Sequence, residues 1–162
     1  MGDVTHTAIF KAVAVTAQQD FFEVKASASA SVLVHGFVLS QSTELGDAQE
    51  EMLQLTTNRG SGTVTSGSGG GSATISRRRR GDPAFGGAVE INNTTKLAVG
   101  TGTLDTDLEV FNWNERVPFM FWYPPEARPM ILPGEYWTLE LETTPADSVT
   151  ISGTIYLEQV GI

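Results

Sequence analysis

The strongest constraint on the fold is a pair of alternating apolar and polar runs near the end of the chain, at residues 135–143 and 148–160. Their apolar positions are Trp137, Leu139 and Leu141, then Val149, Ile151, Ile155 and Leu157. A two-residue period is typical of antiparallel strands with one dry face and one wet face. A Pro-Ala-Asp turn separates the runs, so this part of the chain is predicted to be a β scaffold.

Further strand-like segments bring the predicted total to eight. They span residues 8–15, 20–26, 31–41, 51–58, 107–113, 116–122, 135–143 and 148–160. Eight strands with short turns in a chain of 162 residues predict an all-β fold. We expect a single-domain antiparallel β-sandwich or jelly roll over residues 1–162. A helical turn is predicted near residues 45–51, capped by Thr43 or Asp47.

Composition narrows the chemistry and the partners. The chain has no cysteine, which excludes disulfides and thiolate metal sites. No apolar run approaches the length of a membrane span, so we expect no membrane partner. The start of the chain does not resemble a secretory signal. A formal net charge of −9 repels nucleic acid, so we expect none as a partner.

The middle of the chain combines low complexity with a basic run. Residues 60–72 hold six of the 17 glycines, so residues 60–83 are predicted to form a long flexible loop inserted in the domain. Four consecutive bases follow: Arg77, Arg78, Arg79 and Arg80. Guanidinium groups bind carboxylates in a bidentate way, so the run is predicted to anchor the protein on a partner. The alternative is a solvated loop that offsets local acidity.

The residues needed for catalysis are sparse. His6 falls in a segment expected to be a mobile terminus, and His35 is expected to be a satisfied core or interface side chain. Asp105, Asp107 and Glu109 alternate, so on a strand they would share a face that either binds a hard cation or is simply solvated. No serine stands in a nucleophile-elbow context. We therefore expect no enzyme, no catalytic residues, no metal and no cofactor.

The densest aromatic stretch has apolar side chains on both faces of one strand. Phe119, Phe121 and Tyr123 share a face, and Met120 and Trp122 share the other. The second face needs a cover, either the long loop of the same chain or a second subunit, or else it is an aromatic sugar-binding platform. The predicted subunit interface consists of Phe119, Phe121, Trp122 and Tyr123.

Four segments of the chain resemble a known family. They are Leu132-Pro-Gly-Glu, the Thr-Thr-Pro-Ala-Asp-Ser turn, Ile151-Ser-Gly-Thr-Ile-Tyr-Leu-Glu, and Val34-His-Gly-Phe-Val-Leu-Ser-Gln-Ser followed by Gly46-Asp-Ala-Gln-Glu-Glu-Met-Leu. These segments resemble small capsid decoration (cement) proteins of tailed bacteriophages. The resemblance implies a TNF-like jelly roll that forms a homotrimer and decorates the outer surface of a phage capsid. Residues 60–80 are the part that it does not cover.

Two functions are therefore expected. The first is a structural virion protein, made in the bacterial host cytoplasm, whose homotrimer binds the phage major capsid protein and stabilises the outer capsid surface. Arg77 to Arg80 would anchor it on capsid carboxylates. The alternative is a carbohydrate- or receptor-binding jelly roll of a phage fibre or adhesion apparatus. In that case Trp113, Trp122 and Trp137 are the candidate sugar platforms.

Overall fold

The computed structural model describes residues 3–43 and 50–161. Its elements, in chain order, are β1 (His6–Val15), β2 (Gln19–Lys25), β3 (Ser31–Gln41), β4 (Met52–Ser61), β5 (Val64–Thr65), β6 (Gly71–Ser72), β7 (Thr74–Arg77), β8 (Ala88–Asn93), β9 (Ala98–Val99), β10 (Thr103–Asn114), β11 (Phe119–Trp122), the 3₁₀ turn η1 (Pro125–Ala127), β12 (Met130–Ile131), β13 (Tyr136–Leu141) and β14 (Val149–Val160). The chain is therefore almost entirely β.

The eight principal strands pair as one long antiparallel hairpin. β1 pairs with β14, β2 with β13, β3 with β11, and β4 with β10. The hairpin is rolled up because β14 also pairs with β3 and β13 also pairs with β4. Successive pairs fall alternately in two sheets, which is the jelly-roll topology. The predicted all-β sandwich is confirmed.

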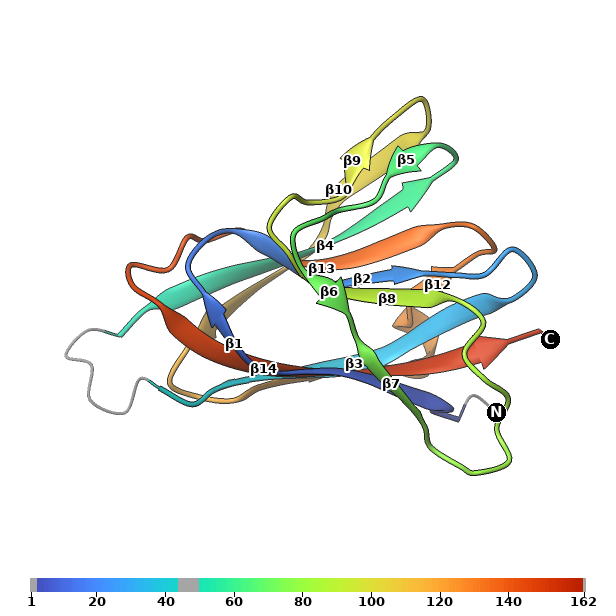
Figure 1. Ribbon diagram of the computed structural model, residues 1–162, viewed down its shortest axis with the longest axis horizontal. Helices are drawn as coiled ribbons and strands as arrows, with labels where there is room; N and C mark the ends of the chain where they lie inside the picture. Colours follow the sequence, from blue (N-terminus) through green and yellow to red (C-terminus); the bar gives the residue numbers. More distant parts are fainter. Residues whose placement is uncertain (1–2, 44–49, 162) are drawn as a thin grey trace.

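The two sheets pack face to face (Figure 1). Sheet A has the order β11-β3-β14-β1-β7, with β12 also paired to β3. Sheet B has the order β10-β4-β13-β2-β8-β6. A two-stranded sheet of β5 and β9 extends the β4 and β10 end of sheet B (Figure 1). The eight strands predicted from the sequence are all present, and β3 has the predicted bounds.

The core lies between the sheets and is built from the inward positions of each alternating strand. Trp137, Leu139 and Leu141 of β13 are buried, as the pattern predicted. Phe37 of β3 is fully buried and has ring contacts with Phe111, Phe119 and Phe121. Burying each large apolar side chain contributes roughly 1.5–3 kcal/mol, so this face-to-face packing determines the fold.

The segment between β4 and β10, residues 62–102, leaves the rolled hairpin and returns to both sheets. We call it the excursion. Its β6 pairs with β8 at the edge of sheet B, and its β7 pairs with β1 at the edge of sheet A, so it crosses one side of the sandwich (Figure 1). Gly70 lies so close to β8 that an added Cβ would come within 1.9 Å of the Ile91 carbonyl oxygen. The predicted loop at residues 60–83 thus contains short strands, and its flexibility stays a prediction. The predicted helical turn near residues 45–51 falls mostly outside the described residues.

Candidate functional site

The aromatic strand β11 sends its side chains to both faces, as predicted. Phe119 and Phe121 are half-buried, and Tyr123, just after the strand, is buried. All three face the core, where Phe121 has ring contacts with Phe111 and Tyr123. Within one protomer these side chains already have packing partners. Trp122 is the member of the predicted set of four that points outward, and the subunit interface itself stays a prediction.

Met120 and Trp122 point outward from β11 and are 63% and 47% exposed. The excursion does not cover them, so the alternative in which the long loop shelters this face is wrong. Trp122 packs on Tyr156 of β14, with 4.7 Å between the ring centroids. Gly36 lies between them in the register, and an added Cβ there would come within 3.1 Å of the Trp122 ring. Glycine is what lets the two rings meet across β3.

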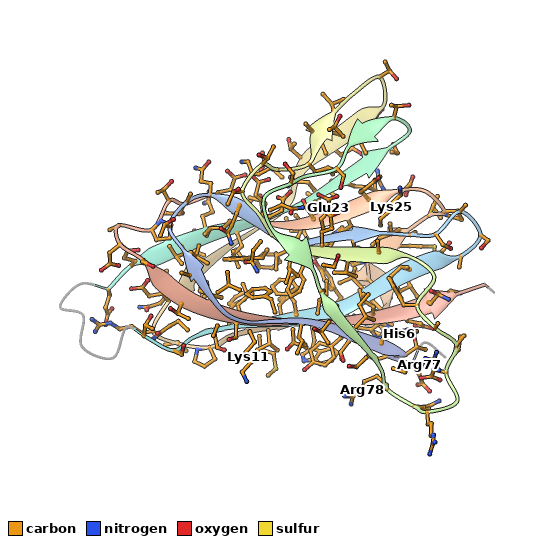
Figure 2. The ribbon with its side chains drawn as sticks, viewed as in Figure 1. His6, Lys11, Glu23, Lys25, Arg77 and Arg78 are labelled. Carbon is orange, nitrogen blue, oxygen red and sulfur yellow. The ribbon has the colours of Figure 1, made fainter. Side chains whose placement is uncertain are left out.

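Two rows of uncharged residues run across the outer face of sheet A. One row consists of Met120, Val38, Thr154 and Ile9, and the next consists of Trp122, Gly36, Tyr156 and Thr7. We call these eight residues the outer A patch. Val38, Thr154 and Tyr156 are half-buried and Gly36 is buried, while Ile9 is 38% exposed. Lys11 lies beyond the patch on β1 and points away from the sandwich (Figure 2). The patch is thus an apolar surface in a protein of net charge −9.

The arginine run lies at the opposite edge of sheet A from β11. All four side chains, from Arg77 at the end of β7 to Arg80, are exposed. Figure 2 labels Arg77 and Arg78 at this edge. The backbone N–H of Arg78 donates to the Thr5 carbonyl oxygen at 2.7 Å, and the Arg79 guanidinium binds the Asp3 carboxylate at 2.7 Å. β3, β14 and β1 separate this edge from β11. The structure therefore does not bring the two predicted contact regions together.

His6 does not lie in a mobile terminus, so that expectation is wrong. It is fully buried as the first residue of β1. Its Nε2 lies 3.0 Å from the Pro83 carbonyl oxygen, and its ring contacts Phe85 edge-on at 5.3 Å. His6 thus connects the segment after the arginines to sheet A. His35 is buried and pairs with Glu158 at 2.8 Å, as expected for a satisfied side chain.

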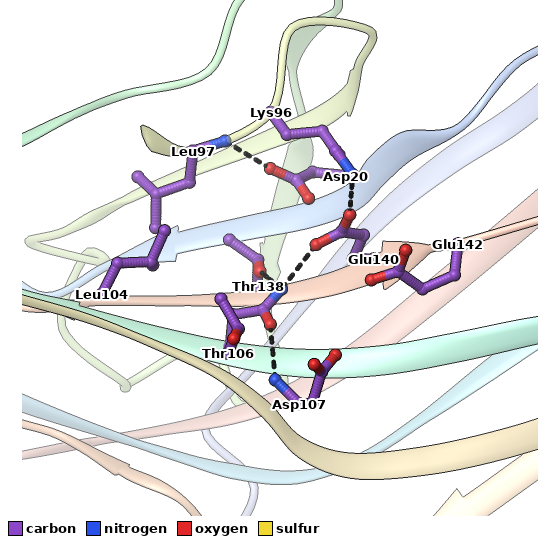
Figure 3. Close-up of a pocket in the computed structure, with 10 residues that line it drawn as sticks. Asp20, Lys96, Leu97, Leu104, Thr106, Asp107, Thr138, Glu140 and Glu142 are labelled. Carbon is purple, nitrogen blue, oxygen red and sulfur yellow. Dashed lines mark hydrogen bonds and ion pairs between the residues drawn. The ribbon is translucent and has the colours of Figure 1, made fainter. Parts of the chain in front are cut away.

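The outer face of sheet B is polar where sheet A is apolar. One cross-strand row contains Glu90, Glu23, Thr138 and Asn58, and the next contains Asn93, Asp20, Glu140 and Thr56. The excursion covers these rows, and a pocket of about 290 Å³ remains beside Asp20 and Glu140 (Figure 3). In it, Asn58 donates to a Glu140 oxygen at 2.7 Å and Lys96 pairs with the other oxygen.

Asp20 is the most unusual ionisable group in this pocket. Its side chain is 1% exposed, and one carboxylate oxygen accepts the Leu97 N–H at 2.8 Å while the other has no hydrogen-bond partner. The pKa of Asp20 is raised from 3.8 to about 7, mainly by burial and in smaller part by the Glu140 charge, against the lowering effect of the Leu97 N–H. Asp20 can therefore change its protonation state near neutral pH.

Buried carboxylates fasten the excursion to sheet B. Glu23 accepts the Ser66 hydroxyl and the Gly67 N–H, the latter at 2.8 Å. Together with the Asp20 bond to Leu97 and the Lys96–Glu140 pair, it gives three attachments along the excursion. The local sequence signal is that Asp20 and Glu23 flank the consecutive phenylalanines Phe21 and Phe22 in a buried strand. The buried carboxylates of this pocket therefore serve to hold the excursion against sheet B.

Asp105, Asp107 and Glu109 do not all share a face. Asp105 and Glu109 stand opposite Arg59 and Thr57, which are two residues apart on β4. The irregular register between them displaces Asp107, whose N–H donates to the Asn58 side chain. Asp107 has φ of 55°, Asp105 pairs with Arg59 at 2.9 Å, and the Glu109 carboxylate lies against the Tyr123 hydroxyl at 2.5 Å. Across residues 3–43 and 50–161, no group of three or more metal-ligating side chains is placed to hold a metal ion. The expectation that all three acids share one face is therefore wrong.

Two of the three candidate sugar platforms are inaccessible. Trp113 is 2% exposed and its indole N–H donates to the Val117 carbonyl oxygen at 2.5 Å, and Trp137 is 1% exposed. Trp122 alone of the three presents its ring to solvent.

Comparison of the chain with protein-family models, with curated proteins and with solved structures finds no match. Among the residues that the structure describes, no helix has the length and apolar character that a membrane crossing requires.

Proposed function

We propose that this protein is a structural virion protein that assembles as a homotrimer on the outer surface of a phage capsid and stabilises it. The observation that carries the proposal is the outer A patch, with Met120 and Trp122 exposed on an edge strand. A chain of net charge −9 repels its own copies, and an uncharged face is where two of them can meet at least cost. The trimeric number and the capsid partner rest on the sequence resemblance.

Light scattering of the purified protein tests the assembly. The wild type should have three times the 17.4 kDa mass of the chain. Met120→Lys places a charge in the outer A patch and should yield a monomer that keeps the β circular dichroism spectrum. Val110→Lys is the matched control, because Val110 is 53% exposed on β10, the edge strand of the other sheet. A monomeric wild type, or a trimer in the Met120 variant, would overturn this interface.

The arginine run supplies the attachment to the capsid. Its guanidinium groups are exposed, and bidentate binding to carboxylates gives them more than a point charge. Three copies of the run on one trimer would multiply weak contacts into avidity. Replacing all four arginines with alanine should abolish co-sedimentation with capsids lacking this protein, while a four-lysine variant should retain part of it. Unchanged co-sedimentation of the alanine variant contradicts the anchoring role.

A carbohydrate- or receptor-binding module is the second proposal, and the exposed Trp122–Tyr156 pair favours it. Two adjacent rings on a flat sheet offer the apolar platform that a sugar ring packs on. Glycan-array binding by the wild type that Trp122→Ala removes would support this function. A cement protein should show no saturable sugar binding, so the array separates the two proposals.

A further inference from the structure

A small pocket enters the sandwich between the two sheets, away from the outer A patch and from the acidic pocket. Its volume is about 230 Å³, roughly the space of seven or eight water molecules. Trp137, Thr57 and Glu109 of sheet B line the pocket, and Leu108, Met130 and Ala127 surround its rim. It lies where β12 and η1 approach β4, β10 and β13.

Trp137 gives this pocket an unused hydrogen-bond donor. The side chain is 1% exposed, and its indole Nε1 is buried with no hydrogen-bond partner in the protein. Buried tryptophan N–H groups usually find an acceptor, since leaving one unpaired is costly. The residue lines the pocket, so an acceptor that enters there can pair with it.

The charges around the pocket select against an anionic ligand. Glu109 Oε2 accepts the Thr57 hydroxyl at 3.0 Å and the Tyr123 hydroxyl at 2.5 Å. Burial, and then the bond to Glu109, raises the pKa of Tyr123, so its hydroxyl stays protonated and continues to donate. The carboxylate disfavours an anion nearby, and the neighbouring Arg59 guanidinium is paired with Asp105 at 2.9 Å. A neutral ligand is not repelled by the Glu109 carboxylate and does not need the Arg59 guanidinium as a counter-ion.

The rim favours an apolar body. Leu108 and Met130 are 48% and 49% exposed, and Ile131 behind them is buried. Exposed apolar side chains around a concave site with a few inward polar groups are typical of small-molecule pockets. We propose that this pocket binds a small neutral molecule with an apolar or aromatic body and one carbonyl or hydroxyl oxygen that accepts the Trp137 N–H.

Two probes that differ in the acceptor test the proposal. Acetophenone has an aromatic body and a carbonyl oxygen, whereas ethylbenzene has a similar body without it. In ¹⁵N-labelled wild-type protein, acetophenone should shift the assigned indole N–H signal of Trp137 saturably, with a dissociation constant on the order of 1 mM. Ethylbenzene should bind about tenfold more weakly, because it leaves the donor unpaired.

A variant that fills the pocket provides the control. Ala127 is exposed on η1, so Ala127→Phe should block the rim and abolish the acetophenone shift without unfolding the protein. Ala84→Phe, at an exposed position outside the pocket lining, should bind as the wild type does. The proposal is overturned if acetophenone gives no saturable shift, if both probes bind equally well, or if the Ala127 variant still binds. None of these readouts depends on trimer formation or capsid attachment.

Discussion

Replacing Asp20 with asparagine should stabilise the protein near pH 8 and have much less effect near pH 4. Asparagine keeps an oxygen that can accept the Leu97 N–H and removes a charge that is buried at high pH. The charged form is unfavourable because the side chain is 1% exposed and Glu140 and Glu23 are nearby. The variant therefore measures how much the buried charge of Asp20 destabilises the folded protein.

The direction follows from the pKa in each state. In the folded protein the pKa of Asp20 is about 7, against 3.8 for an unperturbed group. A raised pKa means that the folded state binds the proton more tightly, so this contribution to stability is complete below pH 3.8 and is lost as the pH rises through 7. The difference between the two pKa values corresponds to roughly 4 kcal/mol, which is the upper limit for the increase in the free energy of unfolding of Asp20→Asn at pH 8.

Thermal unfolding from pH 4 to pH 8.5 measures the effect. One kcal/mol corresponds to about 2–4 °C in a domain of this size, so Asp20→Asn should raise the melting temperature by up to about 8–16 °C at pH 8. Subtracting the wild-type curve removes the titration of the other acids. Asp147→Asn is the control, since it changes the net charge equally at an exposed position and should give a flat difference. A difference for Asp20→Asn that does not grow with pH refutes the reasoning.

Three other substitutions test the fold and the attachment of the excursion. Gly36→Ala should destabilise the protein by about 2–3 kcal/mol in urea unfolding, because its Cβ would lie 2.3 Å from the Phe121 carbonyl oxygen. Phe37→Ala should cost about 3–5 kcal/mol by the same assay, since it leaves a cavity among the three rings that Phe37 contacts. Glu23→Ala should speed hydrogen exchange of the Gly67 amide about tenfold, because it removes the acceptor.

Each of these three substitutions has a control measurement in the same protein. An added Cβ at Gly71 meets no atom within 4 Å, so Gly71→Ala should change stability by less than about 0.5 kcal/mol. Phe85 is only half-buried, so Phe85→Ala should cost less than the Phe37 change. In the Glu23 variant the amide of Leu139 should exchange as slowly as in the wild type. Equal losses of stability at Gly36 and Gly71, or at Phe37 and Phe85, would contradict the packing of sheet A.

The alternating strands could be predicted from the sequence because one face of each is buried. The period of two located the eight principal strands, and it correctly separated Phe121 from Trp122. It also failed where the backbone departs from regular pleating. The positive φ of Asp107 interrupts the alternation, and no residue type there signals the irregularity.

The excursion could not be predicted because its order comes from distant partners. Its glycines and serines have little intrinsic preference for a strand, and composition alone indicates a flexible loop. The buried acceptors at Asp20 and Glu23 lie more than 40 residues earlier in the chain. A carboxylate is ordinarily read as a solvated side chain, so their role emerges only once the sheets are assembled. The same holds for the unpaired indole of Trp137.

The position of β14 has a consequence for synthesis. It follows all the other described strands in the sequence, yet it lies in the middle of sheet A between β1 and β3. Neither neighbour can pair with it until residues 149–160 have left the ribosome, and the ends of β1 and β14 that meet are separated by about 150 residues. Completion of sheet A should therefore be slow, and the edges of β1 and β3 that pair with β14 stay open until that strand emerges.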